Sequence, residues 1–394
     1  MLNGRNALSG HDLLDEQDML GTDNKSAWRN VLGGYDVVKG TQSVKSSQWT
    51  AAAASLVVVA VLIAAVDLWP ARRSDESPAA APTPTPTSST STTSPPASTS
   101  SPTPTSPAVP APAGSPLTGL PGPVGPVLIV KIDNVAPARP QRGLDAADVV
   151  YVEPVEAGLT RLAAVFSSRL PETVGPVRSA RESDLELLRQ FGTPAFAYSG
   201  AAPLLLPAIE AARVAPVSPA QAGPAYVRGS DRSPPHNLYA RPAQLLALAR
   251  GVTPAPDIGF RFGPAPAGGT PSQRELVHYQ AAEYAFEWSA PESRWHVWVD
   301  GRPLADAGGA QLGTPTVVVQ SVVVRPSQFS DVRGSVSPYV ETVGSGAAVV
   351  LRDGATHACR WTRPSPDQGT SFTTADGQPC NFAPGPVWVV LVAA

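Results

Sequence analysis

The sequence is poor in charge and has almost no lysine. Only 15% of its 394 residues are charged and the formal net charge is −3, so we expect no basic surface for nucleic acid. Lysine and arginine total 29, and only 4 of these are lysine. Arginine is therefore the default cation of this chain, and an arginine cluster says less here about ligand binding than it would elsewhere.

Several motifs of common enzyme classes are also absent. The chain has no GxxxxGK[ST] or GxGxxG loop for nucleotides, no HExxH zinc motif and no EF-hand loop. It lacks the GxSxG turn of many serine hydrolases. Neither CxxC nor a Cys/His spacing indicates zinc. We therefore expect neither a metal site nor a cofactor.

Cysteine is nearly absent, with Cys359 and Cys380 as its two occurrences. A sparse, even number of cysteines in a protein outside the cytoplasm indicates a disulfide, although two buried thiols are the alternative. Both lie in a stretch that is expected to be rich in β-structure. We predict a Cys359–Cys380 bridge that closes a loop of about 20 residues.

One long apolar run is present, at residues 49–66 (WTAAAASLVVVAVLIAAV), and it carries no charge. About 18 such residues at ~1.5 Å rise cross a hydrocarbon core of ~30 Å. We predict a transmembrane helix over residues 49–69. Residues 1–48 are longer and more acidic than the start of a signal peptide, so we expect an uncleaved anchor with a cytoplasmic, largely disordered tail.

Residues 70–116 form a predicted linker rich in serine, threonine and proline. They have almost no apolar bulk to offset the entropy of ordering, so we expect this segment to be disordered. Such tracts act as stalks or as plain spacers. With the cysteines beyond it, the linker predicts a single-pass protein of the cell membrane whose C-terminal part is extracytoplasmic.

The rest of the chain has two halves of different texture. Residues 117–255 alternate apolar strand patterns with helical ones, which predicts a mixed α/β domain. Residues 270–394 contain valine-rich runs and Asp-Gly turns, which predict a mostly β domain. The expected fold class is therefore α+β, with two adjoining domains.

A helix is expected to begin at Ser179, because Ser179-Ala-Arg-Glu fits a capping box. Free N–H groups at a helix N-terminus favour an anion, and Arg178 and Arg181 flank this one. We expect both arginines to face a cleft shared with Asp133, Asn134 and Arg139. The alternative is that they pair with protein carboxylates. The carboxylates in question are Glu153, Glu156, Glu182 and Asp184.

His236 is the main candidate for acid–base chemistry. A histidine base needs an acid partner, for which Asp133 and Asp231 are candidates, and a nucleophile such as Ser199 or water. The alternative is a loop histidine that is simply solvated or hydrogen-bonded.

Three other charged residues leave alternatives open. Glu153 and Glu156 could form a carboxylate pair for glycoside chemistry, or they could be solvated loop acids. Lys131 lies in a predicted apolar strand. It is therefore either buried with a partner or placed at the edge of the strand.

Most candidate residues follow predicted strands, where the loops of α/β sheets bind ligands. We predict that they bind an anionic ligand of the cell envelope. The alternatives are an envelope-polymer hydrolase or transferase that uses Asp133 and His236, and a scaffold for a cell-wall partner. The predicted ligand-binding residues are Asp133, Asn134, Arg139, Arg161, Arg178, Ser179, Arg181, His236 and Asn237.

Several further motifs stand out in the sequence: KIDN and ARPQ (131–141), ADVVYVEPVEAGLTR (147–161), VGPVRSARESD (174–184), PHNLY (235–239) and the stretch 317–392. Taken together, they resemble the YerB-like family of bacterial lipoproteins, which have two adjoining domains of unknown function. The resemblance implies an envelope location and a two-part fold, and it implies no activity. This chain departs from the family in having no lipobox cysteine near its N-terminus, where the predicted apolar helix takes the place of a lipid anchor.

Overall fold

The computed structural model describes residues 114–331 and 334–394. The predicted tail, the predicted membrane helix over residues 49–69 and nearly all of the predicted linker lie outside the described residues. Within the described part of the chain, no helix has the length and apolar character needed to cross a membrane.

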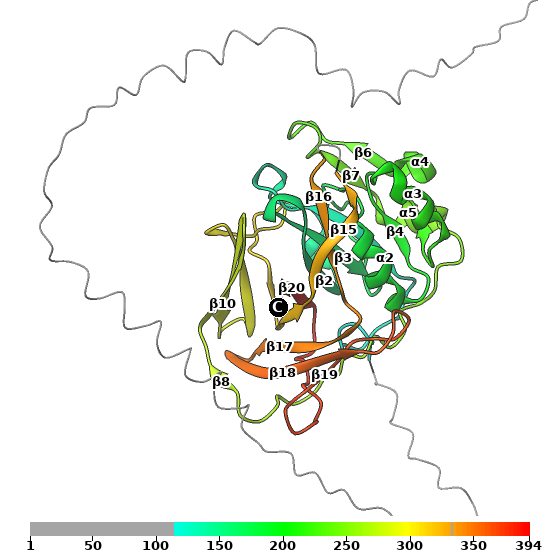
Figure 1. The fold of residues 1–394 in the computed structure, drawn as a ribbon. Coiled ribbons are helices and arrows are strands. Elements are labelled where there is room, and N and C mark those ends of the chain that lie inside the picture. The colour runs from blue at the N-terminus through cyan, green and yellow to red at the C-terminus, as the bar shows by residue number, and fades with distance from the viewer. Residues whose placement is uncertain (1–113, 332–333) are drawn as a thin grey trace, which may run out of the picture. The chain divides into compact units, whose positions relative to one another are not determined.

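One eleven-stranded sheet forms the centre of the fold (Figure 1). Its central strands have near-continuous apolar sequences, as expected for strands that are buried on both faces. In spatial order the strands are β19 (Ser371–Thr373), β18 (Ala355–Arg363), β17 (Gly344–Arg352), β14 (Thr316–Val322), β20 (Val387–Ala393), β2 (Val149–Pro154), β3 (Thr160–Phe166), β1 (Leu128–Asp133), β4 (Ala195–Ala197) and β5 (Ala215–Pro216), with β8 (Thr270–Pro271) paired to β18.

The strand β20 joins the two halves of the chain into this one sheet. It lies between β14 and β2 and runs parallel to both. Val387, for example, is the register partner of Thr316 on one side and of Val149 on the other. The predicted α/β half and the predicted β-rich half therefore share a continuous sheet.

The remaining elements cover this sheet and complete a sheet-rich α+β fold, as predicted. Figure 1 shows the helices on one side of the molecule and the second sheet, which contains β10, on another. The second sheet contains β9 (Arg274–Tyr279), β10 (Ala282–Ser289), β11 (Arg294–Val299), β12 (Arg302–Pro303) and β13 (Gly313–Thr314). Two further ribbons are β15 (Val324–Ser330) with β16 (Val336–Val340), and β6 (Tyr226–Arg228) with β7 (Leu238–Ala240). The α-helices are α2 (Glu182–Leu187), α3 (Leu206–Ala211), α4 (Pro219–Ala222) and α5 (Pro242–Leu248).

Alternation along β1 separates two hydrophobic cores. Val130 belongs to the cluster that contains Phe286 and Trp295 of the second sheet. Ile129 belongs to the cluster on the opposite face, with Leu188 and Phe191 of the segment that follows α2. Because successive side chains of a strand point to opposite faces, the odd-numbered positions of β1 face the α2 side.

The helix predicted to start at Ser179 starts later than expected. Arg181 is its N-cap and α2 has 6 residues, so the prediction that Ser179 caps the helix is wrong. The cap comes from Asp184, whose carboxylate accepts the backbone N–H of Arg181 at 2.6 Å. With so short a helix, the dipole argument for an anion site at this end no longer applies.

The predicted disulfide is present in the structure. Cys359 in β18 is bonded to Cys380, with their Cα atoms 6.4 Å apart. The backbone N–H of Cys380 also donates to the carbonyl of Phe372 in β19, at 2.9 Å. The bridge therefore fastens the segment after β19 to the neighbouring strand at the edge of the large sheet.

Candidate functional site

Charged side chains occupy one face of three neighbouring strands, at the end where β1 and β2 finish. Arg161 lies at the start of β3, opposite Asp133 of β1 on one side and Glu153 of β2 on the other. Directly opposite residues of antiparallel strands project from the same face. An arginine therefore lies between two carboxylate-bearing positions on the face that α2 covers.

Lys131, on the same face, is completely buried and pairs with two carboxylates. Its ammonium group donates to Glu153 and, at 2.8 Å, to Asp184. The second oxygen of Glu153 is buried without a hydrogen-bond partner. Although burial alone would lower the pKa of Lys131, the charges of Asp184 and Glu153 raise it.

Burial raises the pKa of Glu153 to about 8, which favours its neutral form. One ammonium between two buried carboxyl groups is electrically balanced when one of the two is protonated. Of the alternatives left open by the sequence, Lys131 is the buried lysine with partners. Glu153 belongs to this ion-paired group and is neither a solvated loop acid nor half of a carboxylate pair with Glu156.

The raised pKa of Glu153 predicts a pH dependence of stability. Because the folded-state pKa lies above the ordinary value of 4.5, the contribution of this group is fully present below pH 4.5 and is lost as the pH rises through about 8. We expect the free energy of unfolding to fall less steeply over this range in Glu153→Gln than in the wild type. Denaturant titrations at a series of pH values test this, and parallel curves for the two proteins would contradict it.

Arg181 does not face the predicted cleft. Its Nε and Nη2 donate to the two carboxylate oxygens of Glu156 at 2.6 and 2.7 Å, and its Nη1 donates to the carbonyl of Ala180. Glu156 also accepts the hydroxyl of Ser337, and these partners lower its pKa despite its burial. Arg181 is therefore neutralised by protein, and it needs no ligand anion.

Asn134 and Arg139 also serve the fold. The amide of Asn134 donates to Thr160 Oγ1 at 3.0 Å and to the hydroxyl of Tyr284, which belongs to the second sheet. Arg139 donates to the backbone carbonyl of Asn134 at 2.6 Å and pairs with Asp300 at 2.8 Å. The two residues therefore join the loop after β1 to the second sheet, away from the α2 side.

Asn237 is a further predicted ligand residue that is engaged by its own hairpin. Its side-chain oxygen accepts Arg228 Nη1 at 2.9 Å, and its amide donates to the carbonyl of Gly229 at 2.8 Å. Both partners lie in or beside β6. Asn237 therefore stabilises the β6–β7 ribbon.

Asp133 is in contact with both His236 and Arg178, and it is one of the two candidate acid partners that the sequence left open for His236, the other being Asp231. Nδ1 of His236 lies 2.8 Å from Asp133 Oδ2, and Nε of Arg178 lies 3.2 Å from the same oxygen. That Nε makes an ion pair but no well-directed hydrogen bond. The Asp133 side chain is 3% exposed, whereas those of His236 and Arg178 are 22% and 23% exposed. A buried carboxylate thus holds two solvent-accessible groups.

Arg161 has no carboxylate partner within ion-pair distance among the described residues. Its Nη1 donates to the backbone carbonyl of Ser179 at 2.9 Å. Burial, together with the charges of Arg181 and Arg178, lowers the pKa of Arg161 to about 9. An additional negative charge beside this guanidinium would therefore be stabilising.

Residues 178–180 form an extended segment between β1 and the loop after β4. The N–H of Arg178 donates to the carbonyl of Lys131 at 2.8 Å, and the N–H of Ser199 donates to the carbonyl of Arg178 at 3.0 Å. The N–H of Ala180 then donates to the carbonyl of Gly200 at 2.9 Å. These bonds explain why no helix starts at residue 179. A side chain added at Gly200 would meet nothing within 4 Å, so open space borders this segment.

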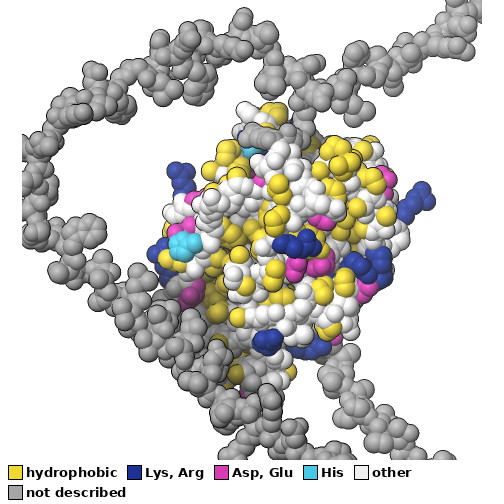
Figure 2. Space-filling model, viewed as in Figure 1, with side chains coloured by type: hydrophobic (Ala, Val, Ile, Leu, Met, Phe, Trp, Pro, Cys, Tyr) yellow, Lys and Arg dark blue, Asp and Glu magenta, His cyan; other side chains and the backbone are white. Residues whose placement is uncertain are grey.

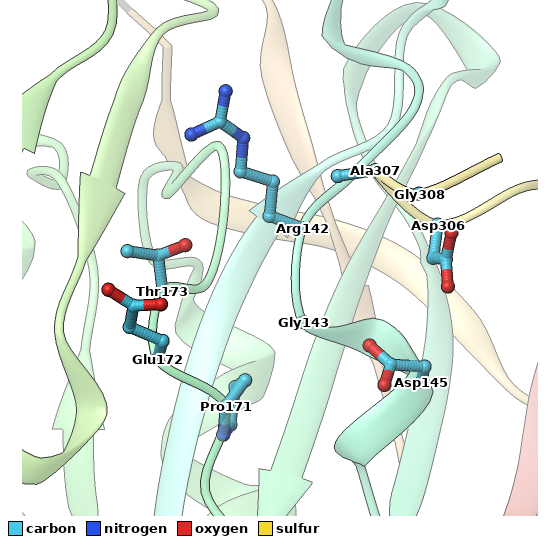
Figure 3. A pocket seen from close by; sticks show the side chains of 9 residues that line it. All are labelled: Arg142, Gly143, Asp145, Pro171, Glu172, Thr173, Asp306, Ala307 and Gly308. Atoms are coloured by element: carbon cyan, nitrogen blue, oxygen red, sulfur yellow. The ribbon is translucent and has the colours of Figure 1, made fainter.

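Two cavities of the described chain lie elsewhere. One, of about 190 Å³, is lined by Arg142 and the acidic residues Asp145, Glu172 and Asp306. Figure 3 shows these carboxylates on separate segments of the chain, with the Arg142 guanidinium pointing away from them. No group of three or more His, Cys, Asp or Glu side chains in the described residues is suited to a metal. The other cavity, of about 550 Å³, lies between β14 and β17 beside Trp361.

We call the group of Asp133, Arg161, Arg178 and His236 the β1 site. Four other residues that were predicted to bind the ligand contribute to the fold instead, because protein partners use their polar groups. They are Asn134, Arg139, Arg181 and Asn237. The sequence left open whether Lys131 is buried, and a buried lysine requires carboxylates close by.

Comparisons with known proteins place this chain in a family. Residues 117–254 match the family described as "Protein of unknown function (DUF3048) N-terminal domain", and residues 276–389 match its C-terminal domain. A segment of 115 residues is 38% identical to "Putative lipoprotein YerB" of Bacillus subtilis (strain 168). It covers 29% of this chain and 34% of that protein.

The fold is also similar to that of a solved structure. The crystal structure of the YerB protein from Bacillus subtilis matches with a TM-score of 0.59 at 22% identity, covering 71% of this chain and 96% of that chain. The described residues therefore have the fold of that protein over nearly its whole length.

Proposed function

This chain belongs to the YerB-like family of proteins with two DUF3048 domains, and we propose that it binds an anionic ligand of the cell envelope at the β1 site.

The curated relative is named as a lipoprotein, which supports an extracytoplasmic, membrane-associated location. The predicted helix over residues 49–69 would supply the anchor as a single span. Protease added to intact protoplasts should then remove the described residues, and their protection would contradict this topology.

The charge balance of the β1 site carries the proposal. Arg181 is neutralised by Glu156, so Arg161 and Arg178 are left with the single carboxylate of Asp133. The site therefore has one positive charge in excess, and both guanidiniums are only partly buried. Guanidinium groups at a partly dehydrated site form strong, charge-assisted hydrogen bonds with phosphate or carboxylate oxygens.

Retention of the full-length protein on isolated cell-wall material tests the proposal. We expect Arg161→Gln or Arg178→Gln to weaken retention by about 10- to 150-fold, since each removes a charged hydrogen bond worth roughly 1.5–3 kcal/mol. The matched control is Arg261→Gln, which breaks the exposed pair with Asp257 far along the chain. Equal retention of all variants, or equal loss in the control, would rule out binding at the β1 site.

The contact between Asp133 and His236 favours a second candidate, an envelope-polymer hydrolase or transferase. A buried carboxylate that accepts the Nδ1 proton leaves Nε2 of the imidazole to act as a base. Arg161 and Arg178 would stabilise negative charge that develops in the transition state. Water is one candidate nucleophile, and Ser199, hydrogen-bonded to the backbone of Arg178, is another.

Release of soluble products from the same material separates this candidate from pure binding. If the protein is such an enzyme, His236→Ala should abolish release, whereas His278→Ala, in an exposed pair with Glu283, should not. If the wild-type protein is retained but releases no products, the result supports binding as the function of the site and argues against the enzyme candidate. Neither retention nor release would favour the scaffold alternative.

A further inference from the structure

A short apolar segment lies directly beside the β1 site. Residues 199–206 (SGAAPLLL) follow β4 and lead into α3. Leu205 is 1% exposed and packs in the core on the α2 side, whereas its neighbours Leu204 and Leu206 are 81% and 38% exposed. The buried Leu205 therefore fixes a backbone that presents two leucines to solvent.

The segment is held next to the arginines by its own backbone. Ser199 and Gly200 are hydrogen-bonded to Arg178 and Ala180, and the carbonyl between these two residues, that of Ser179, accepts Arg161. The space beside Gly200 is open. In Figure 2, hydrophobic side chains gather over the helical region to which α3 belongs in Figure 1.

These leucines leave apolar surface uncovered next to the β1 site. Burial of a leucine side chain contributes about 1.5–3 kcal/mol, and Leu204 forgoes most of it. Leu204 has the highest exposure of the large hydrophobic side chains in the described residues. An apolar surface beside an unbalanced positive charge is complementary to a molecule that carries an anionic group and a hydrocarbon chain.

We propose that the anionic ligand of the β1 site is a phosphate-bearing lipid. Its phosphate would lie against Arg161 and Arg178, and its hydrocarbon chain would pass the open space at Gly200 and cover Leu204 and Leu206. A phosphodiester carries one negative charge, which balances the single excess positive charge of the site. This inference rests on the proposed function and specifies its ligand class.

Two probes that differ only in their acyl chains test the inference. Glycerophosphoglycerol and dihexanoylphosphatidylglycerol, the latter below its micelle concentration, are titrated into the full-length protein and followed by calorimetry. We expect the lipid to bind at least about tenfold more tightly, because its chains bury apolar surface. Dihexanoylphosphatidylcholine, which has the same chains but no net charge, should bind much more weakly than dihexanoylphosphatidylglycerol.

Matched variants locate the two parts of the ligand. Leu204→Ser should remove the tenfold preference and leave glycerophosphoglycerol binding unchanged, whereas Leu248→Ser, at a leucine of α5 that is 49% exposed, should not affect the preference. Arg161→Gln should weaken both probes. Equal affinity for the two probes, or a preference that survives Leu204→Ser, would overturn the lipid inference while anion binding stands. Failure of both probes to respond to Arg161→Gln would overturn the proposed function as well.

Discussion

Replacing Lys131 with alanine should destabilise the folded protein by about 3–5 kcal/mol. Lys131 is the counter-charge of two carboxyl groups that are themselves buried, Glu153 and Asp184. Without the ammonium group, both buried carboxyl groups would lose their counter-charge in a place that water does not reach. The cost of an uncompensated buried charge is much larger than the net benefit of the intact pair.

Chemical denaturation at neutral pH measures this loss. Lys131→Met, which restores most of the hydrocarbon volume but no charge, should be destabilised nearly as much, because the missing charge causes the effect. Arg189→Ala is the surface control, since its partner Asp367 is exposed, and it should change stability little. A small loss in Lys131→Ala, similar to that of the control, would show that the three groups are not an ion-paired unit.

Loss of the Cys359–Cys380 bridge should cost about 3 kcal/mol. In the chain-entropy account, the bond restricts the unfolded chain by linking two residues that are separated by 21 positions in the sequence. The folded protein would also lose a link between β18 and the segment that follows β19, at the edge of the sheet.

Non-reducing peptide mapping should recover the two cysteines in one linked fragment. Denaturation of a Cys359→Ala, Cys380→Ala double variant then gives the free-energy difference from the oxidised wild type. Wild type treated with reductant should match the variant. Separate cysteine peptides, or a double variant as stable as the oxidised wild type, would contradict the prediction.

The sequence was most informative where a pattern is local. Short apolar runs at residues 127–132, 149–153 and 161–166 predicted three strands, and β1, β2 and β3 are present there, because strands that are buried on both faces have near-continuous apolar sequences. The carboxylate partner of His236 was among the candidates, since Asp133 ends a predicted strand and loops meet at such ends.

Pairings between distant residues could not be predicted in the same way. The choice of Glu156 for Arg181, and of Asp184 for the cap of α2, depends on which carboxylate the folded backbone brings within reach. The capping-box pattern at Ser179 was misleading because residues 178–180 satisfy their backbone groups with β1 and the loop after β4. Tertiary hydrogen bonds therefore outweighed a local helix signal.

The position of β20 determines when this protein can fold. The last strand of the sequence occupies the middle of the large sheet, and its two partners, β14 and β2, cannot meet without it. Until residues 387–393 leave the ribosome, both partners have an unpaired edge, and closure requires contacts between parts of the chain that are far apart in sequence. The central sheet therefore cannot be completed before residues 387–393 are free to pair with both of these strands.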